Sequence, residues 1–164
     1  MALLISNTNV SDNKPNSGTG IRIAPSAAAT TKGTLDRVTL NNNYSGVIIS
    51  GDNSTAVGHF AVSIGIVNSV FTNNPYAVKV QSDSAATRVV ARDSFLSEGY
   101  TAFTVSTNNA NTNFLPELYL AHITVSSFGT GVSNTNARAY SYGDNDFANL
   151  TLTNSGAFTQ ISKN

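Results

Sequence analysis

One phrase recurs along the chain at nearly regular intervals. It reads NNNYSGVIIS at 41–50 and returns as TNNPYAVKVQ at 72–81, SEGYTAFTVS at 97–106 and SSFGTGVSNT at 126–135. Each copy shares a small residue, and we use that residue as a reference position. The reference positions are Gly20, Gly46, Ala77, Ala102 and Gly131, at intervals of 26, 31, 25 and 29 residues. A period of this length is typical of a solenoid, in which each repeat packs on the next.

Mostly apolar residues occupy the same places in successive repeats. Pairs spaced by two residues, the period of a β-strand, stand before and after each reference position. For the reference Gly46 these pairs are Gly33/Leu35, Val38/Leu40 and Val47/Ile49. Three short strands in fixed phase predict an all-β protein, a parallel β-helix (solenoid) of about six coils with three strands per coil. We expect right-handed winding, because crossovers between parallel strands prefer that hand.

Each coil needs tight corners, and we expect one three residues before the reference position. That place holds Asn43, Asn74, Gly99 and Phe128. Asn and Gly are favoured where the backbone adopts left-handed angles. Variable lengths are expected at another corner, in SGDNSTAVGHF and QSDSAATR, because loops tolerate such variation.

The pattern predicts a single β-helix domain over 1–164. Its first coil, 1–31, is irregular, the regular coils span 33–135, and an irregular C-terminal coil spans 136–164. End coils are the weak places of a solenoid, because no neighbour covers them on one side.

Charge and composition exclude several classes of function. The 164 residues carry nine basic and nine acidic side chains, so phosphate-backbone binding to nucleic acid has no electrostatic basis. Without cysteine, disulfides and thiolate catalysis are excluded. No apolar stretch approaches the roughly 18 residues of a membrane span, so we expect no membrane insertion. The neutral, Asn-, Ser- and Thr-rich composition indicates an extracellular or cell-surface protein, although MALLIS is too short for a signal peptide.

Two motifs carry a resemblance to a known family. They are GV-x-V preceded by S-x-F-x-x-N, and SYGDN at 141–145 followed by Asn149. Over roughly 33–149 the chain resembles bacterial right-handed parallel β-helix repeat proteins of the pectate-lyase-like superfold. The resemblance implies a secreted protein. It does not select a function, because this superfold hosts polysaccharide lyases, glycoside hydrolases, tailspikes and adhesins.

No catalytic residue is assigned, and the candidates are Arg92, Asp93 and His122. Asp93 and His122 share a column on adjacent coils, and a carboxylate beside a histidine can fix the tautomer of a general base. An exposed ion pair without catalytic role is the alternative. Arg92 shares an outward column with Asp36. The hydrolase signatures of the superfold, which resemble Asn-Thr-Asp, Asp-Asp and Gly-His-Gly, are absent.

We expect no cofactor and no metal site. Asp144 and Asp146 in YSYGDND offer oxygen ligands at alternate positions, which suit calcium, but a polar coil end is the favoured explanation of this segment. Arg88 and Glu117 are expected to form a solvated ladder pair between adjacent coils.

Aromatic residues should form a ladder along one edge. Tyr44, Tyr76 and Tyr100 stand one or two residues before successive reference positions. Such rings could stack on sugars, or they could simply pack on each other and cover the corner. Asn42, Asn73 and Glu98 would supply hydrogen bonds to a sugar.

These features leave three hypotheses. The first is a non-catalytic extracellular β-helix module that binds a polysaccharide or cell-surface glycan in adhesion. The alternative is a structural segment of a larger fibre, filament or adhesin, which self-associates through its end coils. The second alternative is a polysaccharide lyase or glycoside hydrolase.

Overall fold

The protein is a stack of parallel β-strands. The computed structural model describes residues 1–14, 17–26, 29–51, 60–108 and 115–161, and these contain no α-helix. None of the described segments is a long apolar helix of the kind that crosses a membrane. The strands are β1 (Ala2–Ser11), β2 (Thr19–Ile23), β3 (Thr31–Asn41), β4 (Ser45–Ser50), β5 (Val62–Val67), β6 (Val70–Thr72), β7 (Tyr76–Gln81), β8 (Thr87–Ser106), β9 (Glu117–Thr135), β10 (Arg138–Ser141), β11 (Asp146–Ala148), β12 (Leu152–Ser155) and β13 (Thr159–Gln160).

Strands stack along three faces. On the first face, β1, β3, β5, β8, β9 and β10 pair in that order through their N-terminal parts. On the second face, the later parts of β1 and β3 precede β6, the middle of β8, the middle of β9 and β11. On the third face, β2, β4, β7 and the C-terminal parts of β8 and β9 precede β12. Every pair is parallel, as the repeat predicted.

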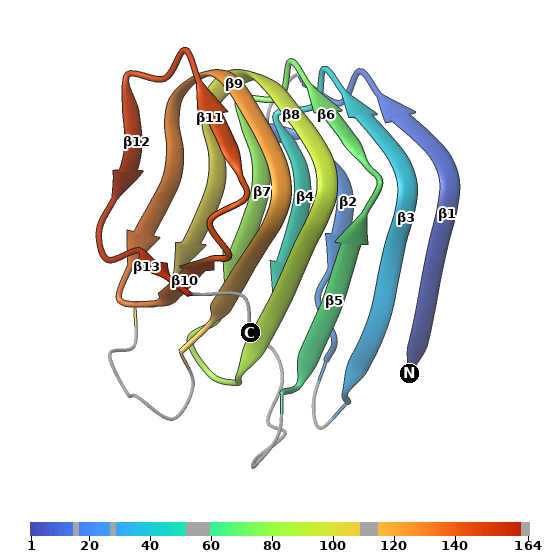
Figure 1. Ribbon diagram of the computed structural model, residues 1–164. Helices are drawn as coiled ribbons and strands as arrows, with labels where there is room; N and C mark the ends of the chain where they lie inside the picture. Colours follow the sequence, from blue (N-terminus) through green and yellow to red (C-terminus); the bar gives the residue numbers. More distant parts are fainter. Residues whose placement is uncertain (15–16, 27–28, 52–59, 109–114, 162–164) are drawn as a thin grey trace.

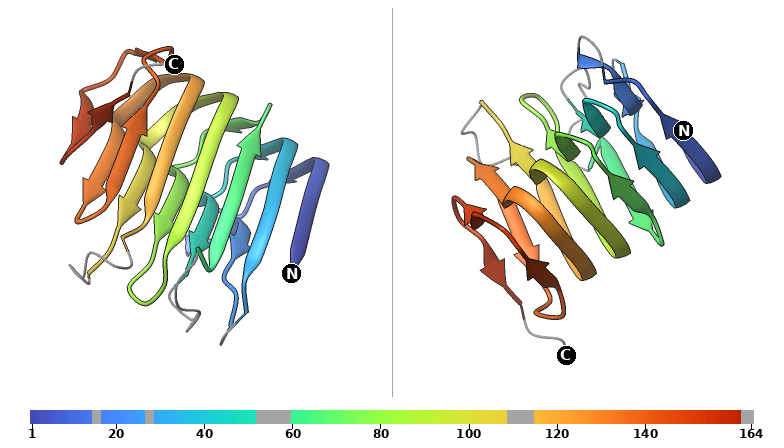
Figure 2. Two further views of the ribbon diagram at one scale, coloured as in Figure 1. Left: turned by 60° about the horizontal axis from the view of Figure 1, so that its bottom comes forward. Right: turned by 90° about the horizontal axis from the view of Figure 1, so that it is seen from above.

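The stack is a β-solenoid of about four turns, which confirms the predicted fold class. Figure 2 shows the colours passing in order from the N-terminal coil at one end to the C-terminal coil at the other. In Figure 1, β8 and β9 each run without interruption around the tube. The right-handed winding and the count of about six coils, which includes both irregular ends, stay predictions, as does the single-domain boundary.

Inward-facing columns form one continuous core. Ile5, Leu35 and Ile66 lie in register on successive coils of the first face. Leu35 and Ile66 are fully buried, because a coil lies on each side of them. The predicted inward pairs on the other faces, such as Val38/Leu40 and Val47/Ile49, are buried as well.

Left-handed residues mark the corners, and they correct the predicted corner position. The residue with positive φ stands four places before the reference position, not three: φ is 56° at Asn42, 54° at Asn73 and 64° at Glu98. The left-handed residue ends the second face, so the next side chain turns inward. The predicted corner residues therefore line the inside of the bend; they are Asn43, Asn74, Gly99 and Phe128.

Buried amides line the first coils of this bend. Asn74 Nδ2 donates to the carbonyls of Leu40 and Thr72 at 2.7 and 2.9 Å, and Asn74 Oδ1 accepts from Asn43 N at 2.9 Å. Asn43 Oδ1 accepts in turn from Asn13 Nδ2 at 2.9 Å. Buried polar groups must be paired in this way, and the amide ladder satisfies them coil by coil.

In later coils of the same bend, a buried aromatic ring takes the place of the buried amides. A side chain on Gly99 would clash with the Asn74 carbonyl and the Phe128 ring, so only glycine fits there. Phe128 is buried in the space that Gly99 leaves open.

A second column of left-handed residues separates the first and second faces. It comprises Asn7, Arg37, Asn68, Asp93 and His122. Asn and Asp adopt these angles readily, whereas other side chains there cost roughly 1 kcal/mol. The corner therefore places Asp93 and His122 side by side on the outside of the tube. The predicted variable segment SGDNSTAVGHF lies mostly outside the described residues.

Candidate functional site

The three tyrosines form the predicted ladder, but their rings are not equivalent. The ring centroids of Tyr44 and Tyr76 are 5.5 Å apart, and those of Tyr76 and Tyr100 are 6.4 Å apart. The interplanar angles of 59° and 65° are those of tilted and edge contacts, which are favourable between aromatic rings. Tyr44 and Tyr76 are half-buried, whereas Tyr100 is 70% exposed. Tyr100 is therefore the member of the ladder that presents a free ring surface.

Lys79 covers the inner part of the ladder. Its Nζ lies 3.8 Å from the Tyr76 ring centroid and 5.5 Å from that of Tyr44. Burial lowers the pKa of the Lys79 ammonium, and the cation–π contact partly offsets the loss of water. Tyr44 and Tyr76 are thus occupied by contacts within the protein.

A surface hollow of about 370 Å³ lies beside Tyr100. Asn73 and Glu98, two of the predicted hydrogen-bonding residues, line it together with Tyr100. The remaining lining residues are Lys14, Pro75, Gly99 and Ser127. Lys14 Nζ donates to Asn73 Oδ1 at 3.0 Å. The hollow therefore combines an exposed ring with an amide, a carboxylate and an ammonium.

Asn42, the third predicted hydrogen-bonding residue, lies outside this hollow's lining. Its Nδ2 donates to Asp12 Oδ1 at 2.7 Å, and its Oδ1 accepts from Asn73 Nδ2 at 3.3 Å. The hydrogen bond from Asn42 keeps the pKa of the exposed Asp12 carboxyl below its usual value. Asn42 thus links the corner residues of neighbouring coils.

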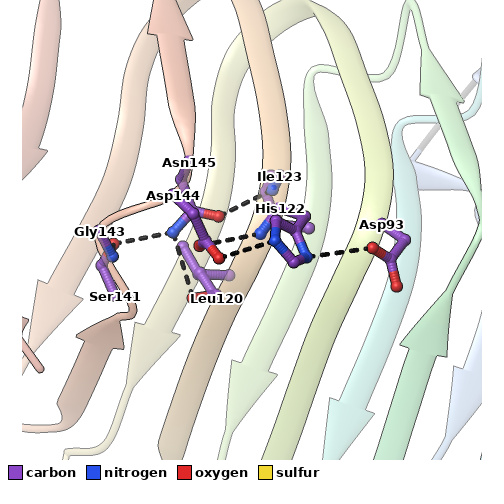
Figure 3. Close-up of polar contacts among 8 residues, drawn as sticks. All are labelled: Asp93, Leu120, His122, Ile123, Ser141, Gly143, Asp144 and Asn145. Atoms are coloured by element: carbon purple, nitrogen blue, oxygen red, sulfur yellow. Dashed lines mark hydrogen bonds and ion pairs between the residues drawn. The ribbon is translucent and has the colours of Figure 1, made fainter. Parts of the chain in front are cut away.

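His122 lies between two carboxylates at the other corner (Figure 3). Its Nδ1 is 3.3 Å from Asp93 Oδ1, and its Nε2 is 3.0 Å from Asp144 Oδ2. The predicted pairing of Asp93 with His122 is therefore present. Asp144, predicted as a metal candidate, is the unexpected member. With each ring nitrogen facing a carboxylate, this arrangement joins three successive coils and offers a substrate no unoccupied ring nitrogen.

The turn before β11 is fixed to β9 by further hydrogen bonds (Figure 3). Asp144 Oδ1 accepts from His122 N at 3.0 Å, and Asn145 Oδ1 accepts from Ile123 N at 2.7 Å. Asn145 Nδ2 donates to the Leu120 carbonyl and to Ser141 Oγ at 3.1 and 2.8 Å. The SYGDN motif thus replaces backbone pairing where the last coil turns.

Two other predicted candidates lie apart from this cluster. Arg92 is separated from Asp36 by the coil that carries Val67, and Asp36 pairs with Arg37 at 2.9 Å. Asp146 is exposed at the start of β11. Across the described ranges, no three His, Asp or Glu side chains converge as metal ligands would.

A hollow of about 410 Å³ lies next to Asp93 and His122. Val70 and Phe95, which are partly exposed on the second face, contribute its apolar wall. Asp93 and His122 therefore line a hollow, and their catalytic role stays a prediction.

Arg88 and Glu117 pair as predicted, but the carboxylate is buried, whereas the Arg88 side chain is partly exposed. The side chain of Glu117 is only 8% exposed, and its Oε2 accepts from Arg88 Nε and Nη2 at 3.1 and 2.9 Å. Arg138, which the repeat did not reveal, donates to Oε1 at 3.1 Å. A buried carboxylate must be paired on all sides, and the second arginine completes that pairing.

The repeat spacing did not predict Arg138 and Asp144 as partners, because the last coil is shorter than the coils before it. Arg88 and Glu117 are 29 residues apart, whereas Glu117 and Arg138 are 21 apart. His122 and Asp144 are 22 residues apart. A search for charged partners at this shorter interval would have found both.

No protein-family model, curated protein or solved structure matches the chain.

Proposed function

We propose that this protein is a non-catalytic extracellular β-helix module that binds a glycan of a polysaccharide or cell surface. Tyr100 is the proposed stacking platform, and Asn73 and Glu98 are its hydrogen-bonding partners. The observation that carries the proposal is the exposed Tyr100 ring at the rim of a polar hollow of about 370 Å³. Binding sites for small ligands combine an apolar surface with a few converging polar groups in this manner.

The proposal includes an assignment to the bacterial, pectate-lyase-like group of secreted β-helix proteins. What supports it is the solenoid together with the SYGDN motif, whose Asp144 and Asn145 cap backbone amides of the preceding coil. Secretion, adhesion and carbohydrate binding are parts of the same proposal.

A glycan array followed by calorimetry tests the proposal. We expect the wild-type protein to bind a defined set of glycans, and Tyr100→Ala to weaken that binding about tenfold through loss of ring stacking. Phe95→Ala is the matched control, because it removes a partly exposed ring from another face. The proposal fails if no glycan binds the wild-type protein, or if both variants bind like wild type.

Self-association is the second candidate function. At the N-terminal end, the inward side chains Leu3, Ile5 and Val10 are only partly buried. At the C-terminal end, Phe147, Leu150 and Phe158 are partly buried in the same way. Coils of another copy stacked on these ends would cover apolar side chains and pair the edge of β1.

Light scattering over a concentration range tests this second candidate. We expect a concentration-dependent increase in mass, abolished by Ile5→Asp, which places a charge where the next copy would pack. Leu4→Asp is the control, because its exposed side chain belongs to the outward column of the same strand. A constant monomer mass at high concentration rejects this candidate.

A further inference from the structure

The outer side of the first face carries a cluster of arginines and tyrosines. Arg88, Glu117 and Arg138 lie in register on β8, β9 and β10, so the buried carboxylate is flanked by a guanidinium on each side. Two cations and one anion leave the trio with a net charge of +1. Because Glu117 is buried, this excess positive charge is presented by the two partly exposed guanidinium groups.

Both guanidinium groups keep hydrogen-bond donors for a ligand. Arg88 uses Nε and Nη2 on Glu117, and Arg138 uses Nη1. In the part of the chain that the structure describes, Nη1 of Arg88 and both Nε and Nη2 of Arg138 make no hydrogen bond. Arginine presents its donors in a rigid plane, so the two bonds from one edge of Arg88 to Glu117 also fix the direction of its remaining donor.

Aromatic rings hold Arg88 in place and extend the surface. Its guanidinium carbon lies 3.8 Å from the Phe60 ring centroid and 5.5 Å from that of Tyr119. Tyr119 stacks on Tyr140 with ring centroids 4.7 Å apart. The Tyr119 hydroxyl donates to Glu117 Oε2 at 3.2 Å. These contacts reduce the side-chain freedom that a ligand would otherwise have to restrict.

A hollow of about 230 Å³ adjoins the cluster. Arg88, Val90, Tyr119 and Tyr142 line it. Its walls are therefore a cation, an aliphatic side chain and two phenol rings. Such walls suit a ligand ring that bears an anionic group, because the aromatic and aliphatic side chains can contact the ring while the guanidinium contacts the anion.

We propose that the Arg88–Glu117–Arg138 cluster is an oxyanion-binding site that takes a sulfate or phosphate monoester carried on a sugar ring. The two guanidinium groups belong to different coils, so one ligand must reach both across Glu117. A tetrahedral group directs three terminal oxygens out of one plane and can meet both groups. A planar carboxylate presents only two oxygens, which offers fewer acceptors to the two guanidinium groups. Tyr119 and Tyr142 contact the ring of the ligand.

Side-chain NMR of the arginines tests this site. Glucose 6-sulfate and glucose 6-phosphate are titrated at constant ionic strength, with glucose and glucuronate as neutral and carboxylate probes. We expect saturable shifts of the Arg88 and Arg138 Nε–H signals with one or both esters, at least fivefold weaker binding of glucuronate, and no response to glucose. Stronger binding of one ester identifies sulfate or phosphate as the preferred group.

Matched variants separate the site from general charge attraction. Arg138→Gln should weaken ester binding about tenfold, because it removes charge-assisted hydrogen bonds while Arg88 still pairs Glu117. Arg138→Lys should restore part of that loss. Arg37→Gln is the control, because Arg37 is an exposed arginine paired with an aspartate elsewhere on the protein. Circular dichroism establishes that each variant is folded.

Several outcomes would overturn the inference. These are shifts that never saturate, equal responses at Arg37 and Arg138, or unchanged affinity in Arg138→Gln. Equal binding of glucuronate would overturn the tetrahedral preference. The test is independent of the Tyr100 hollow: Tyr100→Ala should keep ester binding, so failure at one site does not count against the other.

Discussion

The middle coils and the end coils obey the same pattern but differ in how completely they are covered. In the column Ile5, Leu35 and Ile66, the last two are fully buried, whereas Ile5 in the first coil is only partly buried. The same contrast holds for the bend amides, since Asn74 is completely buried and Asn13 is exposed. Identical positions in the repeat therefore have unequal energetic weight.

This difference shows that a coil is stabilised mainly by its neighbours. Burial of a large apolar side chain is worth roughly 1.5–3 kcal/mol, and a middle side chain is enclosed by coils on both sides. Paired substitutions at equivalent positions in middle and end coils measure the contribution of the missing neighbour. The largest expected difference concerns the buried amides.

Asn74→Ala should lower the free energy of unfolding by about 3–5 kcal/mol. It removes the buried acceptor for Asn43 N and a donor to the carbonyls of Leu40 and Thr72, of which Thr72 keeps the hydrogen bond from Asn42 N. Asn13→Ala, in the first coil, should cost no more than about 1 kcal/mol, because water replaces the exposed amide. Urea unfolding measures both, and equal losses would contradict the dependence on burial.

Ile66→Ala should cost about 2–5 kcal/mol, since it leaves a cavity in a closed core. Ile5→Ala in the same column should cost about 1 kcal/mol, because Ile5 already lies partly in contact with solvent. Denaturant unfolding, combined with hydrogen exchange in β1 and β5, measures the pair. A first-coil loss as large as the middle-coil loss would show that the N-terminal end is covered in solution.

Gly99→Ala should cost about 1–3 kcal/mol through overpacking, because the added methyl group meets the Asn74 carbonyl and the Phe128 ring. Gly65→Ala is the matched change on an outward column, where the nearest atom, Thr34 Oγ1, lies 3.7 Å from the new Cβ. It should be nearly neutral. Thermal unfolding of both variants checks the prediction, which requires Gly99→Ala to melt at the lower temperature.

Tyr119 gives the smallest predicted effect, and it depends on pH. Burial and the nearby Glu117 charge raise the pKa of this phenol above its ordinary value of 10.0. A raised pKa means that the neutral phenol stabilises the folded state below about pH 10, and that this contribution is lost as the pH rises through the folded-state pKa. Tyr119→Phe should therefore show a weaker loss of stability in alkaline solution. Parallel curves for the two proteins above pH 10 would contradict the prediction.

The regular coils were predictable because the direction of each side chain there follows the two-residue period of a strand within a recurring coil. Inward columns such as Val47/Ile49 follow from strand alternation, and the tyrosine ladder follows from the place of each ring one or two residues before a reference position. The rule failed by one residue at the corner. Positions 42 and 43 both hold asparagine, a residue that suits a left-handed corner. Only the structure shows that Asn42 has left-handed backbone angles while the Asn43 side chain is buried inside the tube.

Candidate sites were only partly predictable for a different reason. The pair of Asp93 and His122 obeys the repeat, whereas Asp144 joins it through a shorter last coil. Arg138 reaches Glu117 through the same shortening. Where the repeat length changes, the sequence alone does not tell which residue of the next coil lies beside a given residue.

By itself, the sequence determined the parallel solenoid, its three strands per coil and its core columns, because each of these repeats local strand chemistry many times. Tertiary structure alone decided that Glu117 is buried between two arginines, that His122 lies between two carboxylates, and that Tyr100 is the exposed ring. Burial and charge pairing depend on which coils are in contact. At the irregular end of the chain, that contact is set by packing and not by spacing.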